Sequence, residues 1–258
     1  MPNAAESLKA NAFQKRMNLI VDMGNSSAKA AVFDGSELVL RKRIDGNWAQ
    51  ELKQLAADFK PEACAWAVVG PEEDYPMDLL QQLAPRGLHV TGATPTPLRC
   101  DYGTPRTLGA DRLAAAVGAA SLRPQTDLLI VDVGTCITYD FVQGGERYLG
   151  GNISPGVGMR LRALHEQTAR LPLVQADKPA PPVGRDTETA IRAGVLQGID
   201  HEIKGYICQF LLDSPQGCVF ITGGNGPRFA REIHVERHDA LVERGLNRIL
   251  EHHISTHP

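Results

Sequence analysis

The chain has 258 residues, of which 43% are hydrophobic and 22% charged, as is usual for folded globular proteins. Lys and Arg number 27 against 30 for Asp and Glu, so the net charge is −3, which argues against nucleic acid as a partner. No apolar run reaches the ~18 residues that a membrane-spanning helix needs, which argues against a membrane protein.

The first residues and the cysteines bear on processing and location. Residues 1–16 precede a second methionine, Met17, and lack the continuous apolar stretch of a secretory signal, so we expect a flexible leader outside the fold. Five widely spaced cysteines without a C-x-x-C pair indicate buried free thiols rather than disulfides or zinc ligands. These observations predict a cytoplasmic location.

Short apolar runs alternate with helical patterns in the first half of the chain. Runs at 18–23, 29–34 and 37–42 predict strands, the last two separated by a turn at Gly35 and Ser36. Asn47 is a predicted N-cap for a helix over 48–59, which Pro61 would end. A buried strand at 64–70 and helices at 77–84 and 112–120 follow, and this alternation predicts an α/β sheet.

The second half repeats the opening of the first. A strand over 127–134 ends in Asp132-x-Gly134, which matches Asp22-x-Gly24 at an offset of 110 residues, and Gly145 matches Gly35 at the same offset. We therefore expect two equivalent lobes, 17–122 and 123–258. The second lobe should continue with a shaped loop over 150–160, helices at 161–172, 188–212 and 240–253, and a strand at 218–224.

The segment after the first strand has the residue types of a phosphate site. It reads Asp22-x-Gly24-Asn25-Ser26-x-x-Lys29, in which glycine lets backbone N–H groups approach phosphate oxygens and lysine supplies a positive charge. Asp22 could hold Mg²⁺ directly or through water. A hairpin turn with an incidental Asp and Lys is the alternative, but the second copy at 132–135 favours function.

A third glycine turn follows the predicted strand at 218–224, in the sequence Thr222-Gly223-Gly224-Asn225-Gly226, and is typical of a nucleoside site or of simple close packing. Ligands collect at the carboxyl ends of strands in open α/β sheets. We therefore expect the three glycine turns to meet in one cleft between the lobes.

Two further segments are candidates for substrate binding. Asp111, near the start of the helix at 112–120, could accept a proton from an alcohol, and Arg112 could bind a substrate carboxylate through two hydrogen bonds. Favourable interaction with the helix dipole is the alternative role of Asp111. Thr187 lies at the start of the long helix, where an N-cap and a substrate contact are equally weighted interpretations.

Six segments in order resemble the successive motifs of the type III pantothenate kinases. They are DMGNSSAK, DYGTPRTLGADRLAAAVGA, VDVGTCITYDF, GGNISPGVGMRLRAL, GRDTETAIRAGVLQG and FITGGNG. The resemblance covers nearly everything after Met17. It implies the actin-like superfamily of acetate and sugar kinases and Hsp70, with two ribonuclease-H-like lobes and an active site in the cleft between them. The duplication leads to the same fold independently.

The resemblance implies ATP-dependent phosphorylation of pantothenate, the first step of coenzyme A synthesis, with Mg²⁺ and a monovalent cation, K⁺ or NH₄⁺. It implies a homodimer, with Asp111 as proton acceptor and Asp132 as the K⁺ ligand. Carried over by motif, ATP would be bound by Asp22, Gly24, Asn25, Ser26, Lys29, Thr135, Gly223 and Gly224, and pantothenate by Tyr102, Gly109, Ala110, Asp111, Arg112 and Thr187.

Two other functions are compatible with the same motifs. The family includes members named as accessory factors for transcription, although the retention of Asp111, Lys29 and Asp132 argues against a purely regulatory role. A kinase for another small hydroxy acid is the second alternative, against which Tyr102, Arg112 and Thr187 are the evidence.

Overall fold

The computed structural model describes residues 16–24, 28–70, 72–231 and 233–257. By packing, the chain divides after Val90 into two compact units, which are described separately below. Within the described residues, no helix combines the length and the apolar character that crossing a membrane requires. The leader predicted for residues 1–16 lies outside the described part except for Arg16.

The first unit is a mixed five-stranded sheet with the order β3-β2-β1-β4-β5. β1 and β2 pair antiparallel, whereas β1 and β4 run parallel. Its elements are β1 (Met17–Met23), β2 (Ala28–Asp34), β3 (Glu37–Ile44), α1 (Trp48–Phe59), β4 (Ala63–Val68), the short 3-10 helix Glu72–Asp74, α2 (Met77–Gln82) and β5 (Arg86–His89).

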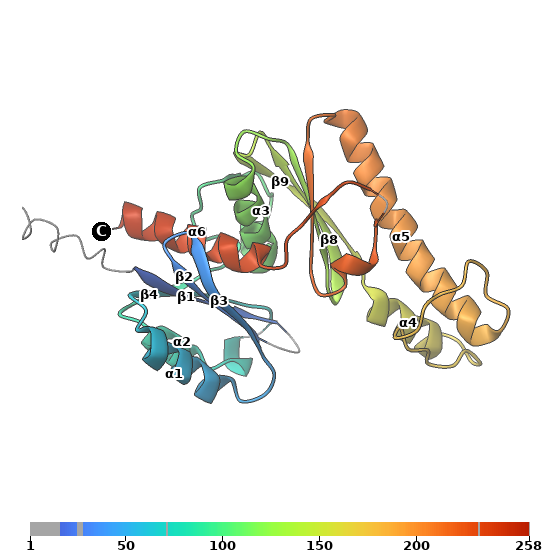
Figure 1. The fold of residues 1–258 in the computed structure, drawn as a ribbon, viewed down its shortest axis with the longest axis horizontal. Coiled ribbons are helices and arrows are strands. Elements are labelled where there is room, and N and C mark those ends of the chain that lie inside the picture. Colours follow the sequence, from blue (N-terminus) through green and yellow to red (C-terminus); the bar gives the residue numbers. More distant parts are fainter. Residues whose placement is uncertain (1–15, 25–27, 71, 232, 258) are drawn as a thin grey trace, which may run out of the picture. The chain divides into compact units, whose positions relative to one another are not determined.

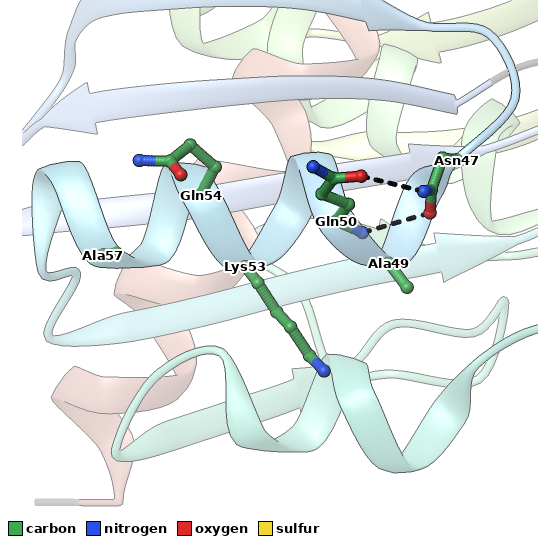
Figure 2. Close-up of a pocket in the computed structure, with 6 residues that line it drawn as sticks. All are labelled: Asn47, Ala49, Gln50, Lys53, Gln54 and Ala57. Atoms are coloured by element: carbon green, nitrogen blue, oxygen red, sulfur yellow. Dashed lines mark hydrogen bonds between the residues drawn. The ribbon is translucent and has the colours of Figure 1, made fainter.

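Helix α1 has the bounds that the sequence predicts, and its start is fixed by the predicted cap. The Oδ1 atom of Asn47 accepts a hydrogen bond from the Gln50 backbone N–H at 3.3 Å, and its Nδ2 donates to Gln50 Oε1 at 3.0 Å (Figure 2). Leu52 and Leu55 on the inner face of α1 join the apolar core of this sheet, which includes Trp66. The helix ends at Lys60, whose backbone is left-handed, directly before Pro61.

The second unit is built around a six-stranded sheet with the order β11-β10-β7-β8-β9-β6. Its elements are β6 (Arg99–Cys100), the 3-10 helix Pro105–Thr107, α3 (Ala110–Leu122), β7 (Leu128–Val133), β8 (Cys136–Gln143), β9 (Arg147–Pro155), α4 (Val157–Glu166), α5 (Thr187–Asp213), β10 (Cys218–Thr222), the 3-10 helix Gly226–Arg228, β11 (Glu236–Arg237) and α6 (Leu241–Thr256).

The predicted duplication is confirmed by the topology of the two sheets. The order β3-β2-β1-β4-β5 in the first unit has its equivalent in β9-β8-β7-β10-β11 of the second. In each copy the first strand pairs antiparallel with the second and parallel with the fourth. Asp22 and Asp132 therefore occupy equivalent positions near the ends of β1 and β7.

Helices cover both faces of the second sheet (Figure 1). Successive side chains of a strand point to opposite faces. Tyr139 of β8 stacks on Tyr206 of α5, with ring centroids 3.8 Å apart, whereas its neighbour Asp140 bonds Arg112 of α3. The predicted apolar stripe of the long helix lies in the core on the α5 face, with Tyr206 partly buried against it and the others buried: Ile191, Val195, Ile199, Ile203, Ile207 and Phe210.

The C-terminal helix α6 packs against α3, the partner that its sequence does not reveal. The two backbones come very close, because a Cβ atom added to Gly118 would overlap the Leu241 carbonyl oxygen and one added to Gly245 would overlap that of Ala114. Small residues on α3 thus create the room that α6 fills.

Two expectations for the second unit were wrong. The glycine-rich segment 150–160 is not a loop, because β9 continues through Pro155 and pairs with β8. Helix α4 begins at Val157 rather than at 161, and it ends at Glu166 rather than near 172. Backbone pairing with β8 satisfies this segment as a strand in spite of its composition.

The packing boundary differs in position from the boundary that the duplication predicts. Residues 91–122 belong to the second unit by contacts, since β6 pairs with β9 and α3 packs against α6, β7 and β8. The lobes predicted as 17–122 and 123–258 are defined by the sequence repeat, and that division stays a prediction.

Candidate active site

In the first unit, Asp22 and Lys29 form an ion pair across the opening hairpin. They are directly opposite each other in the register of β1 and β2, and Lys29 Nζ lies 3.2 Å from Asp22 Oδ2. Asp22 is buried, while the Lys29 side chain is partly exposed. Gly24 follows at the strand end. Asn25 and Ser26, also predicted to bind ATP, lie outside the described residues. The pairing provides a carboxylate and a cation beside one turn.

In the second unit, two of the glycine turns meet at the carboxyl ends of the parallel strands β7 and β10. Thr222 pairs with Asp132 in the register of these strands. Gly223 has a left-handed backbone, with φ +85°, and a Cβ at this position would overlap Asp132 Oδ1. The Asn225 N–H donates to the Val133 carbonyl at 3.0 Å. Only glycine fits at position 223, where the turn after β10 passes the Asp132 carboxylate.

The turn between β7 and β8 is packed equally closely. Gly134 and Thr135 form it, and the N–H of Gly156, at the start of α4, donates to the Thr135 carbonyl at 3.0 Å. A side chain on Gly156 would overlap the carbonyl oxygens of Gly134 and Thr135. The Thr135 side chain is exposed, and so is Gly224, around which there is open space. These exposed groups give a ligand access to the turns.

Asp111 lies in the first turn of α3, as predicted. Its Oδ1 accepts a hydrogen bond from the Arg112 backbone N–H at 2.8 Å. The N-cap is Gly109, where a Cβ would be 2.5 Å from Asp111 Oδ1, so glycine is needed for this carboxylate position. Ala110 is buried between them. The carboxylate is thereby oriented at the helix N-terminus, where the dipole stabilises negative charge.

Arg112 projects into a buried polar network that the sequence did not predict. Its Nε and Nη2 donate to Asp140 Oδ1 at 3.0 and 2.6 Å, and the Tyr148 hydroxyl donates to the same oxygen at 2.7 Å. Arg112 is 6% exposed and Asp140 1%. The Arg112 guanidinium carbon lies 5.8 Å from the ring centre of Tyr102, another predicted substrate residue. The structure thus brings Tyr102, Asp111 and Arg112 together.

Both charges of this network are retained in spite of their burial. Burial alone would lower the pKa of Arg112, but the hydrogen bonds and charge of Asp140 raise it above its usual value. Burial raises the pKa of Asp140, against the opposing effect of Arg112 and Tyr148. In this coupled pair we take Asp140 to be ionised, because a guanidinium at 2.6 Å favours the charged form of the carboxyl group.

Thr187 does not cap the long helix. The N-cap is Asp186, whose Oδ1 accepts from the Thr189 N–H at 2.9 Å in a capping box completed by the Thr189 side chain. Thr187 is the next residue, and it is exposed. Because α5 and α3 cover opposite faces of the sheet, the structure does not place Thr187 beside Asp111 of the same chain.

Among the described residues, no metal-binding cluster marks the site from geometry alone. The described residues contain no group of three or more His, Cys, Asp or Glu side chains placed to hold a metal. A depression over α1 is lined by six exposed residues of this helix and its cap: Asn47, Ala49, Gln50, Lys53, Gln54 and Ala57 (Figure 2). None of them is a candidate site residue.

Comparison with known proteins decides the family. The model of the type III pantothenate kinase family matches residues 18–209. This chain belongs to the type III pantothenate kinases. The relative from Bacteroides fragilis is 42% identical over 238 residues, which is 92% of this chain and 98% of the relative, and that from Porphyromonas gingivalis is 41% identical over 242 residues, 92% and 99% of the two chains. The family resemblance from the six motifs is thereby confirmed, and the chain is a kinase.

Solved structures of more distant proteins share the fold. One, provisionally assigned as a Baf family transcriptional activator from Campylobacter jejuni, is 22% identical with a TM-score of 0.59, over 92% of this chain and 99% of that one. An activator of 2-hydroxyisocaproyl-CoA dehydratase from Clostridium difficile, with bound ADPNP, is 14% identical with a TM-score of 0.53, over 93% and 97%. At these identities the likeness concerns the fold alone, and it agrees with the predicted actin-like superfamily.

Proposed function

We propose that this type III pantothenate kinase transfers the γ-phosphoryl group of ATP to the hydroxyl of pantothenate, the first step of coenzyme A synthesis. Family membership is the basis, and one observation carries the substrate assignment. Asp111 and Arg112 are adjacent at the N-terminus of α3, beside Tyr102. A hydroxy acid needs one group to take the hydroxyl proton and one cation for the carboxylate, and this pair supplies both.

ATP is assigned to the glycine turns and their neighbours. Asp22, Gly24 and Lys29 would bind the phosphates in the first unit, together with Asn25 and Ser26. In the second unit Thr135 would bind phosphate and Gly223 and Gly224 the nucleoside. Backbone N–H groups at glycine turns and the Lys29 ammonium suit phosphate oxygens, and the buried Asp22 carboxylate is an oxygen donor of the kind that Mg²⁺ prefers. Bound Mg²⁺ would neutralise charge on the phosphates.

In the chemical step Asp111 acts as the proton acceptor. As the substrate hydroxyl oxygen bonds to the γ-phosphorus, its proton moves to the Asp111 carboxylate, and the bond between the γ-phosphorus and the bridging oxygen breaks to release ADP. The hydrogen bond from the Arg112 N–H holds the carboxylate in place. Arg112, Tyr102, Gly109 and Ala110 fix the substrate at the other end, so that the hydroxyl faces Asp111.

Asp132 is the proposed ligand of a monovalent cation, K⁺ or NH₄⁺. It lies at the end of β7 with Gly223 directly against its Oδ1 atom. A carboxylate near ATP phosphates would repel them unless a cation lay between. Oxygen ligands from this carboxylate and from turn carbonyls are of the chemical type that K⁺ binds.

A homodimer would complete each pantothenate site with Thr187 of the second copy. The support is that Thr187 is exposed on α5, across the sheet from Asp111 of its own chain. Leu149 and Ile153 of β9 and Met159 of α4 are also exposed, at 45%, 61% and 36%. An apolar surface of this kind is typical of a face covered by another chain. All five cysteines are free, as predicted, but the expectation of burial is confirmed for Cys64 alone, since Cys208 is exposed and the other three are partly exposed. Free thiols support a reducing, cytoplasmic location.

The test is ADP formation by the purified enzyme with Mg²⁺, K⁺ and ATP, with pantothenate compared to other small hydroxy acids such as pantoate and glycerate. We expect turnover with pantothenate that exceeds that with each other acid by at least about tenfold, since the carboxylate and hydroxyl must both be matched. Equal turnover of another hydroxy acid would favour the alternative kinase, and no turnover with any acid would favour a regulatory protein.

A further inference from the structure

We propose that Asp140 and Tyr148 are positioning residues that hold Arg112 with one edge of its guanidinium directed to the substrate carboxylate. This inference rests on the proposed function, in which Arg112 binds that carboxylate. Neither Asp140 nor Tyr148 belongs to the residues assigned from the family motifs, and neither is expected to contact the substrate itself.

The hydrogen bonds select which edge of Arg112 is used. A guanidinium can bind a carboxylate through its Nε–Nη2 edge or its Nη1–Nη2 edge. Asp140 Oδ1 accepts from both atoms of the first edge, at 3.0 Å from Nε and 2.6 Å from Nη2. Asp140 therefore does not use the Nη1–Nη2 edge, which is the edge that we assign to the substrate carboxylate, beside Tyr102. Tyr148 donates to the same Oδ1 at 2.7 Å and so fixes Asp140 in turn.

Two glycines of β9 leave the space that this arrangement needs. Gly151 lies directly opposite Asp140 in the strand register. A Cβ on it would be 2.8 Å from Asp140 Oδ1 and 2.9 Å from Arg112 Nη2. A Cβ on Gly150 would be 3.2 Å from the Tyr102 ring. Gly151 is required first by the Tyr139 backbone carbonyl, which such a Cβ would overlap, and Gly150 by its positive φ of +118°, so the pair leaves room for the Arg112 network without being explained by it alone.

Stability is a weaker account of the buried pair. Arg112 and Asp140 are almost fully buried, and the desolvation of two charges offsets most of the attraction between them. An apolar pair of similar volume would stabilise the sheet equally well. What the ion pair adds is a single orientation for a long side chain that otherwise has many rotamers. That orientation matters where the guanidinium must match a planar carboxylate.

The experiment compares Asp140→Asn with wild type on two substrates, pantothenate and pantothenyl alcohol, in which a primary alcohol replaces the carboxylate. We expect the KM for pantothenate to rise about tenfold, because a charged hydrogen-bond partner of Arg112 is lost. The KM for ATP and the kcat should stay within about twofold, and the KM for pantothenyl alcohol should be equally unaffected, since that substrate does not use the charge of Arg112.

Two further variants keep the test decisive if Asp140→Asn does not fold. Tyr148→Phe keeps the ring and removes only the hydroxyl, and it should raise the KM for pantothenate about threefold with the same selectivity. Asp127→Asn is the matched control: Asp127, directly before β7, also accepts two hydrogen bonds, from Gly144 N and Ser214 Oγ at 2.8 Å each, but away from Arg112. The KM of the Asp127→Asn variant for either substrate should equal that of wild type.

Arg112→Lys separates this inference from the proposed function. If it raises the KM for both substrates equally, the assignment of the carboxylate to Arg112 fails. If it is selective for pantothenate and neither Asp140→Asn nor Tyr148→Phe is, the positioning role alone is overturned. A lower KM for pantothenate in Asp140→Asn would also overturn it, because Asp140 would then compete with the substrate for Arg112.

Discussion

At the N-terminus of α3, one carboxylate is held beside one buried cation, and the roles that we propose for the two can be tested separately. Asp111 is oriented by a backbone N–H, whereas Arg112 is held by Asp140. We predict that Asp111→Asn lowers kcat by ~10²–10⁴-fold while the affinity for ATP stays the same, because the amide keeps the shape but cannot accept the proton. Steady-state kinetics measures kcat, and titration calorimetry measures the affinity for ATP. A variant that keeps more than half of the wild-type kcat would rule out Asp111 as a general base.

The second residue-scale prediction concerns Asp132. Replacing K⁺ by tetramethylammonium at constant ionic strength and constant Mg²⁺ should abolish most of the turnover, because the bulky ion cannot enter between a carboxylate and phosphate oxygens. Asp132→Asn should reduce the dependence of the rate on K⁺. Equal activity in both salts would contradict the assignment of a monovalent cation to Asp132.

At this scale the spacing of Asp, Gly and Lys in the glycine-rich motifs indicated the candidate site residues, and their roles stay predictions. It did not predict Asp140, whose partner is 28 residues away on another element. A comparison of the two copies would have singled it out. Asp140 pairs with Ile130 in the second copy, whereas Ala31 pairs with Ile20 at the equivalent position of the first copy. A carboxylate that replaces a buried alanine in a repeated strand needs a cation, but the repeat does not identify which one.

Among the elements, the contact between α3 and α6 leaves the least room for change. We predict that Gly245→Ala lowers the free energy of unfolding by about 1–3 kcal/mol, because its methyl group would overlap the Ala114 carbonyl oxygen and force the helices apart. Gly205→Ala in α5 is the matched control, as its Cβ would meet no atom within 4 Å, and it should be neutral or stabilising by up to about 1 kcal/mol. Urea unfolding measures both; equal effects would contradict the close contact.

A second element-scale prediction concerns Glu202, which joins α5 to β8, β9 and α4. It accepts hydrogen bonds from Tyr139, at 2.7 Å, and from Ser154 and Arg160. Burial raises its pKa, but the hydrogen bonds from Ser154, Arg160 and Tyr139 outweigh burial and hold the pKa below its ordinary value.

A group with a lowered pKa stabilises the fold above its unfolded-state pKa, and this contribution is lost as the pH falls through the folded-state pKa. The free-energy difference between wild type and Glu202→Gln should therefore be largest at neutral pH and shrink below about pH 4. Urea unfolding at several pH values tests this, with Glu166→Gln, at an exposed position, as control. A difference that does not change with pH would contradict it.

Helices and strands were predicted correctly where the hydrophobic periodicity extends over many residues. The prediction failed where pairing with a neighbouring strand determines the structure. The long helix has its stripe from Ile191 to Phe210 buried as the spacing requires. Residues 150–155 have a composition typical of a loop, yet they form a strand because each of them pairs with a residue of β8, and the Tyr139 carbonyl leaves no room for a side chain at Gly151. Local composition contains neither fact.

For the whole molecule, the repeat at 110 residues predicted two sheets of equivalent topology, and the strand orders agree with it. The repeat could not reveal the packing of residues 91–122 with the second unit, since these contacts are with α6 and β9, far along the chain.

Assembly gives the whole-molecule prediction. If Thr187 acts in the site of the partner copy, mixing inactive Asp111→Asn with inactive Thr187→Ala should restore activity after subunit exchange, to about a quarter of the wild-type sites at equal concentrations. Either variant mixed with itself is the control. A fully active monomer by light scattering would refute the dimer; a dimer without restored activity would place each site within one chain.

Identification of the reaction product is the sharpest test of whether this chain phosphorylates pantothenate. Purified enzyme is incubated with pantothenate, ATP, Mg²⁺ and K⁺, and the products are analysed by ³¹P NMR and mass spectrometry, with Asp111→Asn as the matched control. We predict one new phosphomonoester, 4′-phosphopantothenate, in an amount equal to the ADP formed, and almost none from Asp111→Asn. ADP formation without phosphorylated pantothenate would show that pantothenate is not the acceptor, and an equal yield from both proteins would show that Asp111 is not the proton acceptor.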